Sequence, residues 1–438
     1  MAYYPDWASS SFPPEKIDFG RFDWIDFAFA VPDQSFNLTW DGSDEAPGLL
    51  QRLVTVAHDS GAKVKLSVGG WTGSQYFSPA VADAQSRQVF ANNIRMFYDT
   101  FDLDGIDIDW EYPGQTGNDG NSVSPDDTAN FLSFLQLLRQ TLPVTAKMSA
   151  AVQTVPFAGA DGNPLDDVSA FAQVLDWVLI MNYDAWGSSP TPGPNAPLSD
   201  GCHNSTQPTA NAVAAVRAWT AAGFPADQLV LGVPAYGYIS ESSATGLRQR
   251  SAPSSPSVPR SHRGHLRNRH RARSSGASSE DVSDGASANG SEGAPGISPI
   301  MAANEDGSPA DGQVQFRGLV EQGILQYSPQ EPYEGHAEDA SADGSGAPTR
   351  YSVNGKEIDS LYDGWSGFTR GWDECSSTPF LRSGSADQVV TYDDPLSLGM
   401  KAAFVQGVGL LGVNMFDISG DTDQWDLTDA VRKGLGLN

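Results

Sequence analysis

The stretch FDLDGIDIDWEYPG (101–114) places five acidic side chains, at positions 102, 104, 107, 109 and 111, among readily buried residues. Asp107, Asp109 and Glu111 alternate with apolar side chains within it. Because side chains of a β-strand alternate between its two faces, the three acids share one face and the other face is apolar. Neighbouring carboxylates raise one another's pKa, so such a row has to share protons and costs free energy. The stretch therefore predicts a strand that carries a functional site.

Two alternatives account for these acids without such a site. A calcium-binding loop of EF-hand type needs an oxygen ligand at its fifth position, where Ile106 stands. A solvated edge strand explains a polar face, but it does not explain three acids with no base among them. The functional site is therefore the preferred interpretation.

The composition restricts the class of protein. The chain has 438 residues, of which 39% are hydrophobic, and this length fits two or three domains or one α/β barrel with an insertion. A net charge of −28 argues against nucleic acid and anionic membranes as partners. No apolar run approaches the ~20 residues of a membrane-spanning helix. We expect a soluble protein.

Cysteines, sequons and the start of the chain bear on its compartment. Cys202 and Cys375 stand in loop-like sequence, and we expect one disulfide, with two free thiols as the alternative. Three N-x-S/T sequons permit secretion, although chance also produces them: Asn37, Asn204 and Asn289. No signal peptide is visible, since Met1 runs directly into YYPDW (3–7). Either a signal was removed or the chain is not secreted by that route.

Eight strand-like apolar segments recur along the chain. They are YYPDW (3–7), FDWIDFAFA (22–30), AKVKLSVGGW (62–71), the acidic strand, AKMSAAVQ (146–153), VLDWVLIMNYD (174–184), LVLGVPAYG (229–237) and VGLLGVNMFD (408–417). Helical segments lie between them, at 47–60, 86–98, 125–142, 208–222 and 395–406. Alternating strands and helices predict a parallel sheet, and eight strands predict an α/β fold of the (β/α)8 TIM-barrel type.

The alternation of strands and helices is interrupted between the seventh and eighth strands. We expect residues 1–239 to form the first part of the barrel, 240–391 an insertion, and 392–438 the last strand and final helices. Within the insertion, 248–312 and 330–350 are of low complexity, and 248–312 is predicted to be disordered. They include a basic run that is either a polyanion-binding tag or a loop expansion. The remainder is predicted to be a small α+β unit.

The motif DGIDIDWE (104–111) resembles the D-G-x-D-x-D-x-E signature of glycoside hydrolase family 18, the chitinase family. Other segments resemble this family in the same order: KLSVGGW (65–71), MNYD (181–184), GVPAYG (232–237), YDDPLSLGMKAAF (392–404) and GVNMFD (412–417). The likeness covers about two thirds of the chain, without the low-complexity insertion.

The resemblance implies hydrolysis of β-1,4 bonds between N-acetylglucosamine units with retention of configuration. The acetamide oxygen of the substrate attacks the anomeric carbon, so no carboxylate nucleophile is needed. Glu111 would be the general acid and then the general base. Asp109 would hold the acetamide N–H and stabilise the oxazolinium cation, and Asp107 would share a proton with it. Asp104 falls on the other parity and is interpreted as structural.

The resemblance also assigns substrate contacts. Tyr183 would hydrogen-bond the acetamide oxygen and Asp184 would bind near the reacting sugar, whereas an ordinary strand end is the alternative for both. Sugars have apolar C–H faces, so aromatic platforms are expected along the cleft. The further positions that match substrate contacts are Tyr3, Trp7, Phe29, Trp71, Met181, Tyr236 and Phe416. For the aromatic ones, barrel core is the alternative.

Two positions depart from the family pattern. The eighth strand usually ends in Trp, where this chain has Phe416, whose smaller ring offers less area for stacking. The seventh-strand motif often continues as Y-G-R, where this chain has Tyr238. Neither change touches the proposed acid, Glu111.

The sequence thus predicts a retaining chitinase that acts on chitin or chito-oligosaccharides, as a secreted monomer. No metal or organic cofactor is required, since no His or Cys accompanies the acids at ligand spacing. An endo-β-N-acetylglucosaminidase with the same machinery is one alternative. A non-catalytic chitin-binding lectin is another, although lectins on this fold typically lose the acid that Glu111 supplies. A polyanion binder acting through the basic run is disfavoured by the net charge.

Overall fold

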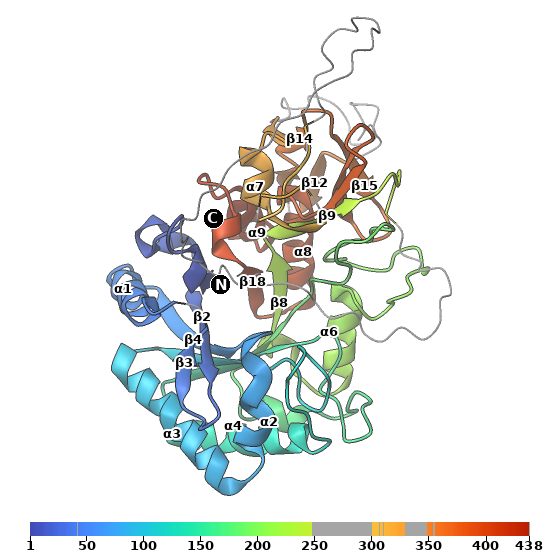
Figure 1. Cartoon of the computed structure of the whole chain (residues 1–438). Helices are drawn as coiled ribbons and strands as arrows, with labels where there is room; N and C mark the ends of the chain where they lie inside the picture. The colour runs from blue at the N-terminus through green and yellow to red at the C-terminus, as the bar shows by residue number, and fades with distance from the viewer. Residues whose placement is uncertain are drawn as a thin grey trace, which may run out of the picture.

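The structure is a computed structural model, and it describes residues 1–41, 43–247, 300–305, 307–309, 311–328, 348–353 and 355–437. Within these residues, eight parallel strands close into a barrel, because the first strand pairs with both the second and the last (Figure 1). In order around the barrel they are β1 (Ala2–Pro5), β2 (Trp24–Pro32), β4 (Lys63–Gly69), β5 (Gly105–Asp109), β6 (Lys147–Val152), β7 (Trp177–Ile180), β8 (Leu229–Pro234) and β18 (Gly412–Phe416). The predicted (β/α)8 barrel is confirmed.

Helices occupy the connections between the barrel strands. Those described are α1 (Ala46–Asp59), α2 (Phe77–Val81), α3 (Ala84–Phe101), α4 (Asp127–Thr141), α5 (Ser169–Ala172), α6 (Ala212–Ala221), α7 (Phe316–Glu321), α8 (Pro395–Val408) and α9 (Asp426–Gly434). Short 3-10 turns are η1 (Asp6–Ala8), η2 (Pro14–Lys16), η3 (Phe19–Arg21), η4 (Gly73–Tyr76), η5 (Ala226–Gln228) and η6 (Ile418–Gly420). The start of α3 is fixed by reciprocal capping, in which Asp83 and Ser86 each accept the backbone N–H of the other. Among the described residues, no helix is long and apolar enough to cross a bilayer.

The alternation of the acidic strand places its two kinds of side chain in different surroundings. Ile106 and Ile108 belong to the large apolar core shared by strands and helices. Asp107 and Asp109 are buried on the opposite face, inside the barrel. The barrel interior also has its own smaller apolar cluster, made by Tyr3, Ala28, Phe29, Ala151, Trp177, Leu179 and Val230. The barrel therefore encloses acids and aromatic rings together.

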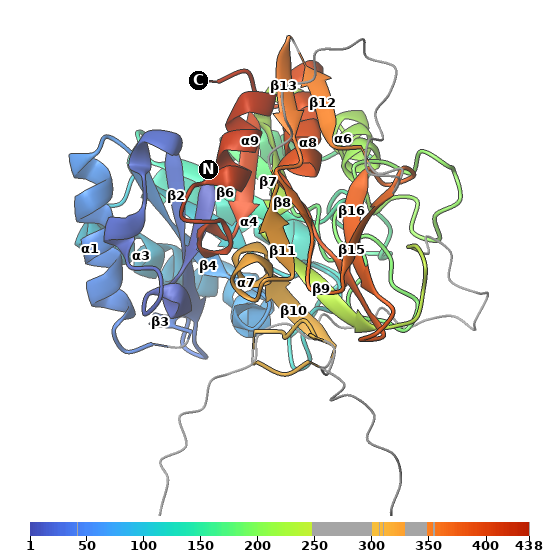
Figure 2. The same cartoon turned by 90° about the horizontal axis from the view of Figure 1, so that it is seen from above.

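An insertion lies between β8 and β18, beside α8 (Figure 2). Its main sheet is antiparallel, in the order β10 (Gly312–Gln315), β9 (Tyr236–Glu241), β17 (Gln388–Thr391), β16 (Thr378–Ser383) and β15 (Thr369–Asp373). The insertion also has two small antiparallel sheets, which are β11 (Leu325–Tyr327) with β14 (Tyr362–Gly364) and the hairpin of β12 (Arg350–Val353) with β13 (Lys356–Asp359). Outside the insertion, β3 (Leu38–Trp40) pairs antiparallel with β2 at the edge of the barrel sheet.

The segment 229–237, interpreted above as one strand, is divided at Ala235. The Ala235 N–H donates to the carbonyl of Phe416 at 2.8 Å, while its carbonyl accepts from the N–H of Phe316 at 2.8 Å. The first bond belongs to the barrel and the second to the insertion. The chain thus passes from β8 into β9 with both backbone groups of Ala235 hydrogen-bonded.

Much of the low-complexity sequence, 248–299 and 329–347, lies outside the described residues, and so does the prediction made for it. The described piece 300–305 packs on the insertion sheet. Ala302 is buried, and its N–H and C=O are both bonded to the side-chain amide of Gln388, at 2.8 and 3.0 Å.

The expected disulfide is present. It joins Cys202, in the connection between β7 and α6, to Cys375, in the turn between β15 and β16, with the two Cα atoms 5.1 Å apart. The bridge is supported by the backbone, since Gly201 N–H donates to the Cys375 carbonyl at 2.8 Å. It fastens a barrel loop to the insertion across 173 residues of sequence.

Candidate active site

The acid row occupies the barrel from its interior to its carboxyl end. Asp107 and Asp109 lie on β5, and Glu111 follows directly after the strand. The backbone of Glu111 is held at both polar groups: its N–H donates to the Ser74 hydroxyl at 2.8 Å, and its carbonyl accepts from the Asn121 amide at 3.1 Å. These bonds orient the side chain toward the mouth of the barrel, where active sites of this fold lie.

The close approach of β4 to β5 beside the row depends on glycine. A Cβ atom at Gly69 would lie 2.1 Å from the Asp109 carbonyl oxygen, so only glycine fits there. The next residue, Gly70, donates its N–H to that same carbonyl at 2.8 Å. The two glycines of KLSVGGW thus let Trp71 leave the strand next to the acids.

Asp107 is the deepest acid and the most fully bonded. Its carboxylate accepts from the hydroxyl groups of Tyr3 at 2.9 Å, Ser67 at 2.8 Å and Ser149 at 2.5 Å. These three donors fix the orientation of the carboxylate. Tyr3, expected as a substrate contact, is only 1% exposed and instead supports Asp107 from beneath the cavity.

Asp109 has the opposite environment. Its oxygen Oδ1 is buried and has no hydrogen-bond partner among the described residues. Burial, with the negative charges of Glu111 and Asp107 beside it, raises the pKa of Asp109 well above its ordinary value. An acid with an unused buried oxygen at the wall of a cavity is suited to receive a hydrogen-bond donor from a ligand.

Glu111 has the properties of a proton donor at neutral pH. Burial raises its pKa to about 7; the hydrogen bond from Tyr112 opposes that shift and the negative charge of Asp184 adds to it. A group with a pKa near the working pH can both give and take a proton, as general acid–base catalysis requires.

The wall that faces the acid row comes from the segment that follows β7 and from β9. Asp184 accepts hydrogen bonds from the phenols of Tyr236 at 2.7 Å and Tyr238 at 2.6 Å, and its N–H donates to Asn195 at 2.9 Å. Tyr183 lies beside them, with its ring 6.1 Å from that of Tyr236. Tyr238, which stands where the family pattern often has Arg, therefore donates a hydrogen bond directly to Asp184.

Aromatic rings form the floor. The Phe416 ring lies 5.3 Å from that of Tyr3, 6.0 Å from Tyr183 and 6.3 Å from Tyr236. Trp7 is on the turn η1, beyond the strand end where it was expected. It is 46% exposed, and its ring is 6.3 Å from that of Phe29. Trp7 thus extends the aromatic surface outward.

These residues enclose a cavity of about 330 Å³. Of the residues expected from the sequence, its lining includes Phe29, Trp71, Asp109, Glu111, Met181, Tyr183, Asp184, Tyr236 and Phe416. Tyr3 and Asp107 lie beneath it, and Trp7 lies outside it. The sequence did not indicate the other lining residues: Tyr112, Gln153, Thr154, Val155, Asn182, Ala185, Gln207, Thr209, Ala210, Tyr238 and Gln313. Two of them had a usable signal, since Tyr112 follows a predicted strand end and Gln153 is the last residue of a predicted strand. The loop residues Gln207 and Thr209 had none.

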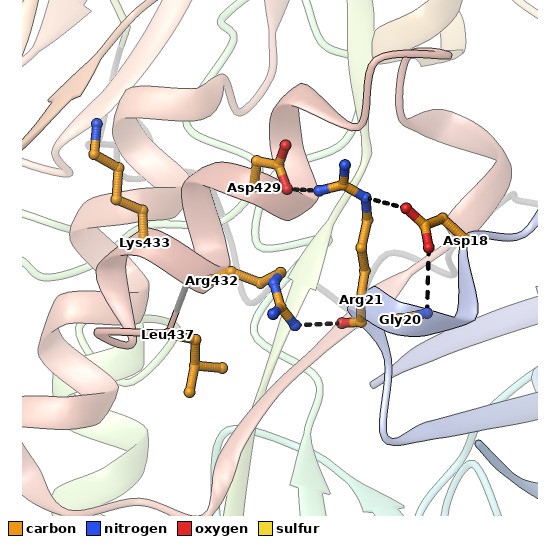
Figure 3. A pocket seen from close by; sticks show the side chains of 7 residues that line it. All are labelled: Asp18, Gly20, Arg21, Asp429, Arg432, Lys433 and Leu437. Carbon is orange, nitrogen blue, oxygen red and sulfur yellow. Dashed lines mark hydrogen bonds and ion pairs between the residues drawn. The ribbon is translucent and has the colours of Figure 1, made fainter. Parts of the chain in front are cut away.

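A second cavity, of about 560 Å³, lies between η3 and α9 (Figure 3). Because η3 leads into the start of β2, this cavity is near the amino ends of the strands, away from the acid row. Its Arg21 is paired with Asp18 at 3.0 Å and with Asp429, and the Arg21 carbonyl accepts from Arg432 at 3.1 Å. The charge of Arg21 is thus satisfied within the protein. Among the described residues, no cluster of three or more His, Cys, Asp and Glu is arranged to hold a metal ion.

An acid row at the carboxyl end of a (β/α)8 barrel, walled by tyrosines and floored by aromatic rings, is the kind of site that the glycoside hydrolase resemblance predicts. The sequence model for glycosyl hydrolases family 18 matches residues 1–421, and the chain belongs to this family. The resemblance drawn from the motifs is confirmed.

Three similar proteins illustrate the range of the family. A chitinase-like effector of Moniliophthora roreri is 35% identical over 440 residues, which cover 100% of this chain and 92% of the effector. Chitinase A1 of Niallia circulans is 26% identical over 373 residues, 83% of this chain and 41% of that protein. The crystal structure of the chitinase RmChi1 from Rhizomucor miehei superposes with a TM-score of 0.69 and 28% identity, covering 99% of each chain.

Proposed function

We propose that the chain is a chitinase that hydrolyses β-1,4 linkages between N-acetylglucosamine units with retention of configuration. The observation that carries this proposal is Glu111, an acid with a pKa of about 7 that lines the cavity next to Asp109. Chitinases among the similar proteins support the choice of substrate.

The proposed reaction has two steps. In the first, Glu111 gives its proton to the glycosidic oxygen while the acetamide oxygen of the substrate bonds to the anomeric carbon and the leaving sugar departs. Asp109, through its unpaired oxygen, accepts the acetamide N–H and stabilises the positive charge of the oxazolinium. In the second, Glu111 takes a proton from water, whose oxygen bonds to the anomeric carbon and reopens the ring.

The remaining residues hold the sugar during these steps. Tyr183 would donate its hydroxyl to the acetamide oxygen, and its raised pKa, due first to burial, keeps that proton in place. Asp184 would bind hydroxyl groups near the reacting sugar from its fixed position between Tyr236 and Tyr238. Phe416, Trp71 and the exposed Trp7 would stack on sugar faces.

We also propose that the protein acts outside the cell as a monomer. The disulfide between Cys202 and Cys375 supports an oxidising compartment, because such bonds persist there and are rare in the cytosol.

A second candidate is a chitin-binding protein that does not cleave its ligand. The names of the chitinase-like effectors of Moniliophthora roreri and Moniliophthora perniciosa, 35% and 34% identical to this chain, favour considering it. An endo-β-N-acetylglucosaminidase that acts on N-glycans would use the same acids on a different substrate.

Turnover of a fluorogenic chitotriose substrate by the wild type and by Glu111→Gln tests the proposal. Loss of the general acid is expected to lower kcat on the order of 10²–10⁴-fold while the sugar still binds. Asp102→Asn is the matched control, because this exposed acid of the same stretch has φ 54°, a conformation that asparagine tolerates. Binding of chitotriose without turnover by the wild type would support the non-cleaving candidate, and turnover of an N-glycan alone would support the endoglycosidase.

A further inference from the structure

Beneath the acid row, the barrel interior contains a buried cation that the proposed reaction does not use. Lys65 on β4 is 1% exposed. Its ammonium lies 3.1 Å from the carboxylate of Asp26, on β2, and 3.8 Å from that of Asp107. It also donates to the hydroxyl of Ser149, which in turn donates to Asp107. Lys65 therefore reaches the acid row both directly and through one hydroxyl.

The strand register explains how a lysine fits there. Residues 65, 67 and 69 of β4 pair with 105, 107 and 109 of β5, so Lys65 lies one layer below Ser67 and Asp107 on the same face. Its neighbour on β5 is Gly105, where a Cβ atom would lie 3.0 Å from Cγ of Lys65. The glycine that begins the acidic strand thus leaves room for the lysine side chain.

The side chains around Lys65 come from several strands, and most of them are polar or charged. Asp26 is its closest counter-ion and also accepts from the Asn414 amide, on β18, at 2.7 Å. The Trp177 ring, on β7, has its centroid 4.6 Å from the ammonium. The charged groups that face Lys65 are Asp26, Asp107 and the amino group of Met1, which donates to the Val413 carbonyl at 3.0 Å.

A buried cation at this distance favours the ionised form of a neighbouring carboxylate. Because the charge of Lys65 is matched by Asp26, it can remain buried without the penalty of an unpaired ion. Asp107, which already accepts from three hydroxyl groups, has this cation as well, whereas Asp109 has neither. The two aspartates of the row thus face opposite electrostatic environments.

We propose that Lys65, with Asp26 as its counter-ion, is a positioning residue for the reaction proposed above, on which this inference rests. It places a positive charge beside Asp107 and fixes that carboxylate through Ser149, so that the pH dependence of the reaction depends on Lys65. Lys65 touches no substrate, and it acts through Asp107.

The test is the pH profile of kcat/KM for Lys65→Met, whose acid limb reports the ionised carboxylate of the free enzyme. Loss of the cation is expected to move this limb to higher pH by about one pH unit or more. At a fixed pH below the limb, kcat/KM is then about tenfold lower for each pH unit by which the limb moves, whereas well above the limb it is unchanged. Lys401→Met is the matched control, because Lys401 is equally buried and paired with Asp393 but belongs to α8. This control should lose stability without moving the limb.

A role confined to packing would lower the melting temperature of Lys65→Met and leave the acid limb in place, and this result would overturn the inference. If the single variant does not fold, Asp26→Asn with Lys65→Met removes both charges without leaving a lone carboxylate. Its limb should move in the same direction but less, because the negative charge of Asp26 is lost too.

Infrared titration of the protonated-carboxyl band, assigned with Asp107→Asn, gives a readout that does not depend on turnover. In Lys65→Met the Asp107 band is expected to appear at higher pH than in the wild type. If the wild type shows no turnover, the proposed function fails, and this titration still decides the role of Lys65. An unchanged Asp107 titration would reject that role even in an active enzyme.

Discussion

Glu111 is a residue whose function costs stability. Its pKa rises from 4.5 to about 7, first because of burial and then because of Asp184. Between these two pH values the folded chain retains a proton that the unfolded chain releases, so the free energy of unfolding falls as pH rises through this window. A difference of this size corresponds to roughly 3 kcal/mol. Stability is therefore given up to keep an acid protonated at neutral pH.

Glu111→Gln is expected to remove this pH dependence, because glutamine is neutral throughout. Its free energy of unfolding should exceed that of the wild type at about pH 8 by roughly 3 kcal/mol and approach it at about pH 4.5. Denaturant unfolding at the two pH values measures both quantities. If the free energy of unfolding changed with pH by the same amount in both proteins, the raised pKa of Glu111 would be contradicted.

Tyr238 is a residue whose role the family pattern did not indicate. Its phenol and that of Tyr236 both bond to Asp184, so Tyr238 takes the polar role that an arginine would have. Tyr238→Phe removes one charge-assisted hydrogen bond, worth about 1.5–3 kcal/mol, and loosens Asp184. We expect KM for chitotriose to rise by roughly 10-fold or more, with a smaller change in kcat. Exposed Tyr327 provides the control Tyr327→Phe, and equal effects of both changes would argue against a specific role of Tyr238.

At the scale of elements, strands were predictable and loops were not. A strand in a closed barrel has one polar or mixed inner face and one apolar outer face, so a period of two located Asp107, Asp109 and Glu111 from sequence alone. The same argument had a signal for Lys65, which stands two residues before Ser67, but an isolated charge in an apolar run was not interpreted. Gln207 reaches the cavity from a loop, where no periodicity applies, and Gln313 reaches it from β10, a strand of the insertion whose strands were not located from the sequence.

The disulfide acts between elements rather than within one. Cys202 and Cys375 join the loop after β7 to the insertion, and the loop carrying Gln207 lines the cavity. Replacing both cysteines by serine is expected to lower the free energy of unfolding by about 2–5 kcal/mol, since the bridge restricts a long loop in the unfolded chain. Denaturant unfolding with and without a reductant checks this. A reductant should destabilise the wild type to the level of the double variant and leave that variant unchanged.

At the scale of the whole molecule, acids outnumber bases by 54 to 26. The excess destabilises the compact state by self-repulsion, while the ion pairs that oppose it are mostly at the surface. Exposed pairs contribute about 0–1 kcal/mol each, and their short distances make them less sensitive to salt than long-range repulsion. Salt should therefore stabilise the folded chain, because it weakens the repulsion more than it weakens the ion pairs.

We expect the melting temperature at pH 7 to rise by a few degrees between about 10 mM and 200 mM NaCl, because the screening length falls below the spacing of many like charges. The rise should shrink near the pI of about 4.3, where the excess charge is neutralised. KM for a neutral chito-oligosaccharide should not change over the same range, since the substrate has no charge to be steered. Thermal scans and initial rates in matched buffers measure the two effects separately. A melting temperature that falls with salt at pH 7 would mean that exposed ion pairs, such as that of Arg52 and Glu15, outweigh the net charge.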